Sequence, residues 1–340
     1  MMKEKKTPGG NNTRDWIEVV KKYNRPDPKK SIWQIVNSLG PYAALWYLMY
    51  LSLEISYVLT LGLSLLAAGF LVRMFIIFHD CGHGSFFKST RANKIVGTFL
   101  GSLTFTPYDR WHKDHAYHHS HVGNLDKRGI GDVMTLTVEE YRKLSPAKKF
   151  EYRLYRHPIV IFGIAPVILF VIWFRFIQKP MNRPVRNSVH LTNLIIAATV
   201  VGLILLFGWK AYLLIQIPVI YFATVAGVWL FYVQHQFEDV IWTRSGEWDY
   251  RTMALEGSSY LKFPRLLQWF SGNIGFHHVH HLSPKIPNYN LERCHRENAM
   301  FRGIKPVTFR PSLRTMNLRL WDEKLGKLIS FRQFRQMAQA

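Results

Sequence analysis

The sequence has few cysteines and few acidic residues. Only Cys81 and Cys294 occur among 340 residues, which excludes a framework of several disulfides and fits a reducing compartment. Lysine and arginine (44) outnumber aspartate and glutamate (22), giving a net charge of +22. In a soluble protein this excess would suggest nucleic acid, but no nucleic-acid-binding motif accompanies it. We therefore expect no nucleic-acid partner.

The first residues also lack the apolar stretch and cleavage site of a secretory signal. We therefore expect residues 1–30 to form a basic cytoplasmic segment that precedes a single large domain at 31–322, followed by a tail at 323–340. The chain contains no internal repeat and no polar linker that would divide the middle of the sequence.

Apolar runs and aromatic rings are abundant. The mean hydropathy of −0.04 averages a very apolar centre with basic ends. Aromatic residues make up 15% of the chain, which suits a lipid–water boundary. A helix needs about 20 apolar residues to cross a bilayer. The runs that we expect to cross are residues 33–53, 55–78, 191–207 and 211–233. The run 95–108 is too short, and Gly163 and Pro166 interrupt the run 158–176.

Positive charge predicts the topology. Basic residues before the first span and in the loop 175–186 should both stay in the cytoplasm. The run 158–176 must then lie in the interface or re-enter rather than cross. We predict an all-α integral membrane protein of the cell membrane, with four crossings, two membrane-associated segments and a cytoplasmic helical cap.

Histidines are concentrated in three clusters that each follow an apolar run. The clusters read HDCGH from His79, HAYHH from His115 and HHVHH from His277. On a helix, residues at i, i+3 and i+4 share one face, and His278 falls off that face. Neutral imidazole binds iron, zinc, copper or nickel. The number of candidates exceeds the three or four ligands of one zinc ion and suggests two metal ions with an open position.

Less specific interpretations also apply to histidine clusters. A single i,i+4 histidine pair is ordinarily a solvated helix face, but three clusters on one side of the membrane are hard to attribute to chance. Metal transport sites usually lie within spans, whereas these clusters follow the spans. A hydroxylase, a membrane zinc hydrolase and a transporter or lipid-sensing receptor remain open at this point.

The three clusters resemble the histidine boxes of the membrane fatty acid desaturase superfamily, in the usual order. The stretches FIIFHDCGHGSFF, WLFYVQHQFED and NIGFHHVHHLSPKIPNY extend the resemblance to acyl-lipid desaturases of bacilli, in particular the delta-5 type. The similarity runs from about residue 31 to residue 322.

This resemblance implies an oxygen-dependent enzyme that desaturates phospholipid-bound acyl chains with two iron ions. It implies ferredoxin or flavodoxin as the electron donor, and no haem-binding HPGG motif is present in the sequence. The iron ligands that it implies are His79, His83, His115, His118, His119, His235, His277, His280 and His281. The alternative for His235 is a side chain satisfied by Glu238 or Asp239.

Metal-bound histidines usually donate their second N–H to a carboxylate or carbonyl. The candidates for this supporting role are Asp80, Asp114, Asp132, Glu238, Asp239 and Asn273. The aromatic candidates for an acyl tunnel are Trp111, Tyr117, Trp269 and Phe276, although simple packing explains each one better when it is taken alone. His112 and His121 are not expected to bind metal, and His157, His190 and His295 are expected to be structural.

Overall fold

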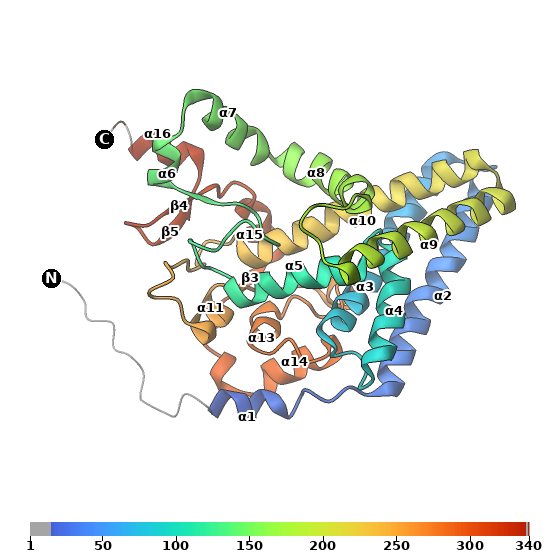
Figure 1. The fold of residues 1–340 in the computed structure, drawn as a ribbon, viewed down its shortest axis with the longest axis horizontal. Coiled ribbons are helices and arrows are strands. Elements are labelled where there is room, and N and C mark those ends of the chain that lie inside the picture. Colours follow the sequence, from blue (N-terminus) through green and yellow to red (C-terminus); the bar gives the residue numbers. More distant parts are fainter. Residues whose placement is uncertain (1–14, 338, 340) are drawn as a thin grey trace.

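The structure, a computed structural model, describes residues 15–337 and 339, and its long helices form two antiparallel hairpins. The first hairpin consists of α2 (Pro28–Ser52) and α3 (Tyr57–His83), and the second of α9 (Arg183–Phe207) and α10 (Trp209–His235). Figure 1 shows that these helices extend together toward one side of the molecule, whereas the short helices and strands gather at the other side.

Local sequence signals place the ends of these helices. The Asp27 side chain caps α2 by accepting hydrogen bonds from the backbone of Lys29 and Lys30. Gly84 ends α3 in a left-handed conformation with φ 64°, which glycine adopts without strain. Gly208, with φ 83°, is the only residue between α9 and α10.

Three helices in the described part of the chain are long and apolar enough to cross a membrane: α3, α9 and α10. Helix α7 (Pro146–Tyr155) and the segment Ile159–Arg175 together pass the same test but meet at an angle of 51°. Helix α2 has 25 residues but is not apolar enough to be counted with them. The predicted crossing at residues 33–53 therefore stays a prediction.

The segment that the sequence marked as interrupted is irregular in the structure. It runs through η1 (Ile159–Ile164), α8 (Ala165–Val167), η2 (Ile168–Ile172) and η3 (Trp173–Arg175), in which π-helical and 3-10 turns alternate with one short α-helical turn. Pro166 lies in α8 and lacks the N–H that a regular helix would use, so a local change of helix type is expected. That this segment lies in the interface or re-enters stays a prediction.

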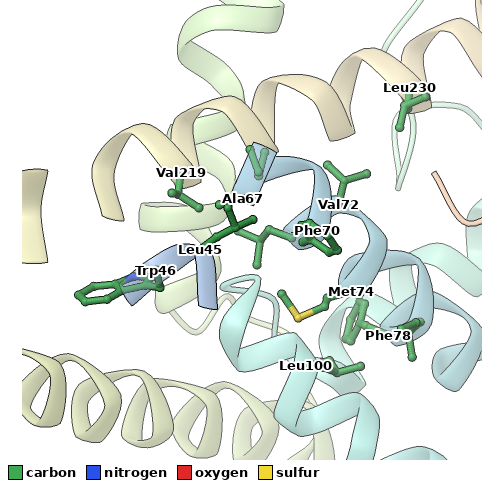
Figure 2. Close-up of a cluster of buried hydrophobic side chains, with 14 of the residues drawn as sticks. Leu45, Trp46, Ala67, Phe70, Val72, Met74, Phe78, Leu100, Val219 and Leu230 are labelled. Carbon is green, nitrogen blue, oxygen red and sulfur yellow. The ribbon is translucent and has the colours of Figure 1, made fainter. Parts of the chain in front are cut away.

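Helix α3 lies at the centre of the hydrophobic core. Over the most apolar 18 residues of each helix, α3 is 61% buried but α9 only 11%. Figure 2 shows Met74 and Phe78 of α3 beside Leu100 of α4 (Thr90–Leu103), and Ala67 of α3 beside Leu45 of α2 and Val219 of α10. Within lipid, this close packing rather than removal from water holds neighbouring helices together. The outward face of α9 is left free for lipid.

The short elements form a cap over the ends of the two hairpins. The helices not yet named are α1 (Asp15–Lys21), α5 (Tyr108–His121), α6 (Val138–Lys143), α11 (Tyr250–Glu256), α12 (Arg265–Phe270), α13 (His277–Leu282), α14 (Asn288–Glu297), η4 (Ala299–Phe301), α15 (Phe309–Thr315) and α16 (Phe331–Met337). The helical content agrees with the sequence prediction, but the cap also contains short strands that it did not include.

These strands form two small sheets. In the first, β4 (Leu320–Asp322) pairs in parallel with β1 (Leu136–Thr137) and antiparallel with β5 (Lys327–Ile329). In the second, β2 (Tyr260–Lys262) pairs in parallel with β3 (Pro306–Thr308). Strand β5 and helix α16 belong to the predicted tail at 323–340, so this part of the chain packs on the cap.

Arg156 links the cap to the end of α10 through hydrogen bonds. Its side chain is fully buried, and its Nη2 donates hydrogen bonds to Tyr232 Oη (3.0 Å), Gln236 Oε1 (3.0 Å) and the Leu318 carbonyl (2.9 Å). Charge-assisted bonds of this kind are roughly twice as strong as neutral ones. They hold the region after α7, the last turn of α10 and the chain before β4 in one arrangement next to His235.

Candidate metal centre

All of the predicted ligand histidines lie at the same end of the two hairpins. His79 and His83 occupy the last turn of α3, which continues beyond the predicted span, and His235 is the last residue of α10. The second box lies within α5 and the third forms α13. The hairpins therefore bring α3 and α10 to one place, where α5 and α13 meet them.

The nine histidines form two groups whose ligand atoms lie within 4.8 Å of one another in each group. The five-histidine group contains His79, His83, His115, His119 and His280. The four-histidine group contains His118, His235, His277 and His281. Every side chain is buried except that of His83, which is half-buried. None of the nine predicted residues is left out.

The Nε2 atoms point toward one another in each group. In the five-histidine group, His119 Nε2 lies 3.1 Å from His115 Nε2 and 3.0 Å from His280 Nε2. In the four-histidine group, His235 Nε2 lies 3.0 Å from His118 Nε2 and 2.9 Å from His277 Nε2. The groups adjoin, because the rings of His119 and His281 stack with centroids 4.0 Å apart.

The chemistry of these atoms fits bound metal cations. Burial, with a further contribution from neighbouring imidazoles, lowers the pKa of His115, His118 and His277 well below the usual value. A neutral imidazole has only one N–H, so several Nε2 atoms facing one another leave lone pairs pointed at a common centre. Neutral imidazole is the form that binds a metal ion. The site therefore offers two sets of nitrogen ligands, more than one zinc ion would use.

An aspartate supports the five-histidine group. His79 Nδ1 lies 3.3 Å from Asp80 Oδ1, so the carboxylate accepts its hydrogen and leaves Nε2 free as a ligand. Asp80 Oδ2 in turn accepts from the backbone N–H (2.6 Å) and the side-chain amide (2.9 Å) of Asn288. Asn288 exchanges two hydrogen bonds with Gln34. Asp80 was expected in this role, whereas Asn288 and Gln34 come from distant helices and had no sequence signal.

A backbone carbonyl supports the four-histidine group. His235 Nδ1 lies 3.3 Å from the carbonyl oxygen of Gly257, an arrangement that leaves Nε2 free to bind a metal ion. Glu238 and Asp239 are exposed, and Asp239 lies 3.8 Å from Lys305. The alternative that a nearby carboxylate satisfies His235 is therefore wrong in this structure. No sequence pattern would have singled out the Gly257 carbonyl.

The other candidates for a supporting role lie elsewhere. Asn273 Oδ1 accepts a hydrogen bond from Gln268 (2.9 Å), and Asp114 is half-buried without a recorded bond to a ligand histidine. Asp132 accepts from the Gly129 N–H (2.7 Å), and burial raises the pKa of its carboxyl to about 6. Asp132 also lines a small cavity with His118 and His235. The cavity measures about 10 Å³, which is room for about one water molecule.

Aromatic side chains enclose the histidines on two sides. Trp111 stacks on His115 with centroids 4.2 Å apart, and Phe231 contacts both His118 (5.3 Å) and His235 (5.2 Å). The other predicted tunnel residues do not line the centre: Tyr117 stacks on His121 and Phe276 on Tyr260. Trp269 stacks with Arg73. Each of these three rings therefore packs against another side chain, and their place in an acyl tunnel stays a prediction.

His278 lies outside both groups, as its position on the helix predicts. Its ring is buried, and its Nε2 lies 2.9 Å from Nδ1 of His295. His295 also stacks on Phe301. His295 was expected to be structural, and this pair joins α13 to α14 behind the metal centre.

The fold and the site together define a class: a helical membrane protein in which clustered, buried histidines can hold metal ions. The sequence model of the family described as "Fatty acid desaturase" matches residues 55–309. A "Fatty acid desaturase" of Bacillus subtilis is 47% identical over 318 residues, covering 94% of this chain and 90% of that protein. This chain belongs to the fatty acid desaturase family, and its enzymatic class is that of the desaturases, which are oxidoreductases.

More distant relatives carry more specific names. The "sn-1 acyl-lipid omega-3 desaturase (ferredoxin)" of Synechocystis is 28% identical, with 69% of this chain and 64% of that protein covered. The "sn-1 oleoyl-lipid 12-desaturase" of the same organism is 26% identical, with 75% of this chain and 70% of that protein covered. The names of these relatives differ in the position of the double bond.

Proposed function

We propose that this chain desaturates phospholipid-bound fatty acyl chains at the delta-5 position in an oxygen-dependent reaction. Two iron ions would be held, one by the five-histidine group and one by the four-histidine group, with all nine histidines as ligands. The observation that carries this proposal is the convergence of nine imidazoles from distant parts of a desaturase-family chain into two adjoining groups.

Removing hydrogen from two neighbouring methylene groups requires a stronger oxidant than any side chain. If bound, two iron ions reduced by an external donor would supply that oxidant from O2, whose two oxygen atoms would leave as water. The protein holds the ligands in place through Asp80 and the Gly257 carbonyl, which orient His79 and His235. The rings of Trp111 and Phe231 pack against the histidines and restrict their movement. A misplacement of about 1 Å at such a site can cost 100-fold in rate.

The substrate and the donor are proposed from the relatives and from charge. Two relatives are named as acyl-lipid desaturases, and one of these names includes ferredoxin. The net charge of +22 would attract an acidic donor protein such as ferredoxin or flavodoxin. The delta-5 position rests on the resemblance of the quoted stretches to acyl-lipid desaturases of bacilli.

The active site is proposed to face the cytoplasm from the cell membrane. The N-terminal end of α2 follows Lys21 and Lys22, and basic residues retain loops on the cytoplasmic side. The two hairpins return the chain to this same side, where the histidines lie. Four crossings, with α2 as the first of them, would satisfy this arrangement.

Expression in a host that has only saturated membrane lipids tests the function. Mass spectrometry that locates double bonds in extracted lipid should show new unsaturation at carbon 5, and metal analysis of the purified protein should give two irons per chain. Unchanged lipid beside an active control desaturase would overturn the proposal. A double bond elsewhere would overturn the delta-5 assignment alone, an oxygen-bearing product would indicate hydroxylation, and one zinc without iron would indicate hydrolysis.

A further inference from the structure

A second, more open cavity lies between α2, α3, α12 and α14, beside the metal centre. Its volume is about 570 Å³. Four cations and a single carboxylate, Glu292, line it, together with aromatic and amide side chains. The cations are Lys30, Arg73, Arg265 and Arg296. We call this cavity the basic cleft.

Arg73 is the unusual residue of the basic cleft because it lies inside the apolar helix α3. Its side chain is only 6% exposed. Its Nε donates to Ser38 Oγ (3.1 Å), its Nη1 donates to the Trp269 carbonyl, and its guanidinium stacks over the Trp269 ring at 3.9 Å. Within residues 15–337, no carboxylate pairs with it. A buried charge in a membrane helix is costly and marks a functional site, so an anion is the expected missing partner.

Two further cations of the basic cleft are also free of carboxylates. Neither Lys30 nor Arg265 forms an ion pair with any residue that the structure describes, and both are exposed. Arg296 differs, because it pairs with Glu292 on its own helix. The cleft therefore retains an excess of positive charge in one place. Arginine is well suited to phosphate, which it binds through two parallel hydrogen bonds.

The rim of the basic cleft has the composition of a membrane boundary. Of the lining residues, Trp33 is 65% exposed and Trp269 36%, and Leu266, which follows Arg265 in α12, is 67% exposed. Tryptophan rings beside lysine and arginine are typical of the headgroup level of a bilayer. An anion that enters this cleft from the membrane would belong to a lipid headgroup, and phosphate is the anionic group that phospholipids share.

The basic cleft and the five-histidine group share a wall. Gln34 lines the cleft and hydrogen-bonds Asn288, which binds Asp80, the partner of His79. Along α3, His79 lies six residues beyond Arg73, or about 9 Å at 1.5 Å per residue. A lipid with its phosphate in the cleft would therefore have the ester end of its acyl chain near the metal centre.

We infer that the basic cleft binds the headgroup phosphate of the phospholipid whose acyl chain is oxidised, with Arg73, Lys30 and Arg265 as its cationic partners. This inference rests on the proposed function. A phosphate held here would determine how many acyl carbons separate the ester from the carbons that are oxidised. The short separation favours a double bond close to the ester, as in delta-5 desaturation.

Lipid binding to the purified, metal-loaded protein tests the inference without any turnover. Native mass spectrometry would compare dipalmitoylphosphatidylglycerol with dipalmitoylglycerol, which has the same chains but no phosphate. The wild-type protein should bind the phospholipid at least about tenfold more tightly, since one charge-assisted contact is worth that much. Because Arg73 also supports the fold, the variant of choice is Lys30→Gln/Arg265→Gln. It should lose about tenfold in phospholipid affinity and none for dipalmitoylglycerol.

The matched control is Lys29→Gln/Lys262→Gln, which removes two exposed positive charges next to the cleft but not lining it. This control should change phospholipid affinity by less than about twofold, which is within the range of a nonspecific surface charge effect. Equal losses in both variants, or equal wild-type affinity for the two lipids, would overturn the inference. So would displacement of the phospholipid by an equal concentration of inorganic phosphate, which would indicate a site for free phosphate.

The two proposals fail in different ways. Unsaturated product without any preference for the phosphate-bearing lipid would overturn the headgroup site and leave the desaturase function intact. Phosphate-dependent binding without unsaturated product in the host would support the headgroup site and overturn the proposed reaction.

Discussion

The two histidine groups differ in how the helices supply them. Each pair at i,i+4 stays together: His79 with His83 and His115 with His119 in the five-histidine group, and His277 with His281 in the other. In the two boxes that contain three such histidines, the histidine at i+3 belongs to the other group. His118 of α5 joins the four-histidine group, and His280 of α13 joins the five-histidine group.

Helix geometry explains this exchange. At 3.6 residues per turn, the i+4 side chain lies about 40° around the helix from the first residue, whereas i+3 lies about 60° in the opposite direction. A helix that carries all three side chains can therefore direct those at i and i+4 toward one group and the one at i+3 toward the other. Helices α5 and α13 lie between the two groups and each contributes to both.

The groups also differ in their supports. A side chain, Asp80, orients His79 in the five-histidine group, whereas the Gly257 carbonyl orients His235 in the four-histidine group. A side-chain support can be removed by substitution with little change of shape. A backbone carbonyl cannot be removed by substitution, and a mutation can only shift its position. The two groups should therefore respond differently to mutations of equal size.

The largest effect is expected from removing the i+3 histidine of α5, which belongs to the four-histidine group. His118→Ala should abolish desaturation and lower the iron content from two to about one per chain, because it deletes one of only four ligands. Product analysis and metal analysis on the same preparation provide the measurement. His112→Ala is the matched control, since this exposed histidine of α5 belongs to neither group. Activity that survives His118→Ala would show that the four-histidine group is dispensable.

A smaller effect is expected from weakening the side-chain support. Asp80→Asn should reduce iron affinity or activity by about 10–100-fold, because His79 loses a charged hydrogen-bond acceptor. The loss should fall on one of the two irons, which Mössbauer spectroscopy can distinguish. Asp114→Asn, which removes a half-buried carboxylate of α5 without a recorded bond to a ligand, serves as the control. Equal loss of both irons would contradict the separate support of the two groups.

The smallest effect is expected from displacing the backbone support. A Cβ at Gly257 would lie 2.6 Å from the Met253 carbonyl oxygen, so Gly257→Ala must shift the loop that presents the carbonyl to His235. We expect about a tenfold loss of activity, at the lower end of the range for a lost metal-supporting contact. Gly246→Ala, where the added carbon meets nothing within 4 Å, should leave activity unchanged. Wild-type activity in Gly257→Ala would mean that His235 needs no such support.

Much of the site could be predicted because its signals are local. The spacing of the boxes and the resemblance of the surrounding stretches led to all nine histidines that the two groups contain. Asp80, next to a box residue, was also expected. Asn288, Gln34 and Gly257 were missed because their roles depend on contacts between residues that are far apart in the chain. The aromatic candidates were only partly informative, since packing and tunnel lining use the same residue types.

The amino-acid sequence by itself determined which segments are apolar and helical, where the histidines recur and that their types suit metal binding. These properties follow from composition and periodicity, which act over a few turns of a helix. Only the tertiary structure decided how nine imidazoles divide between two groups and which atoms support them. It also placed Arg73 of α3 opposite Lys30 of α2 and Arg265 of α12 in one cleft. The reason is that such pairings depend on the packing of whole helices against one another, which no local pattern encodes.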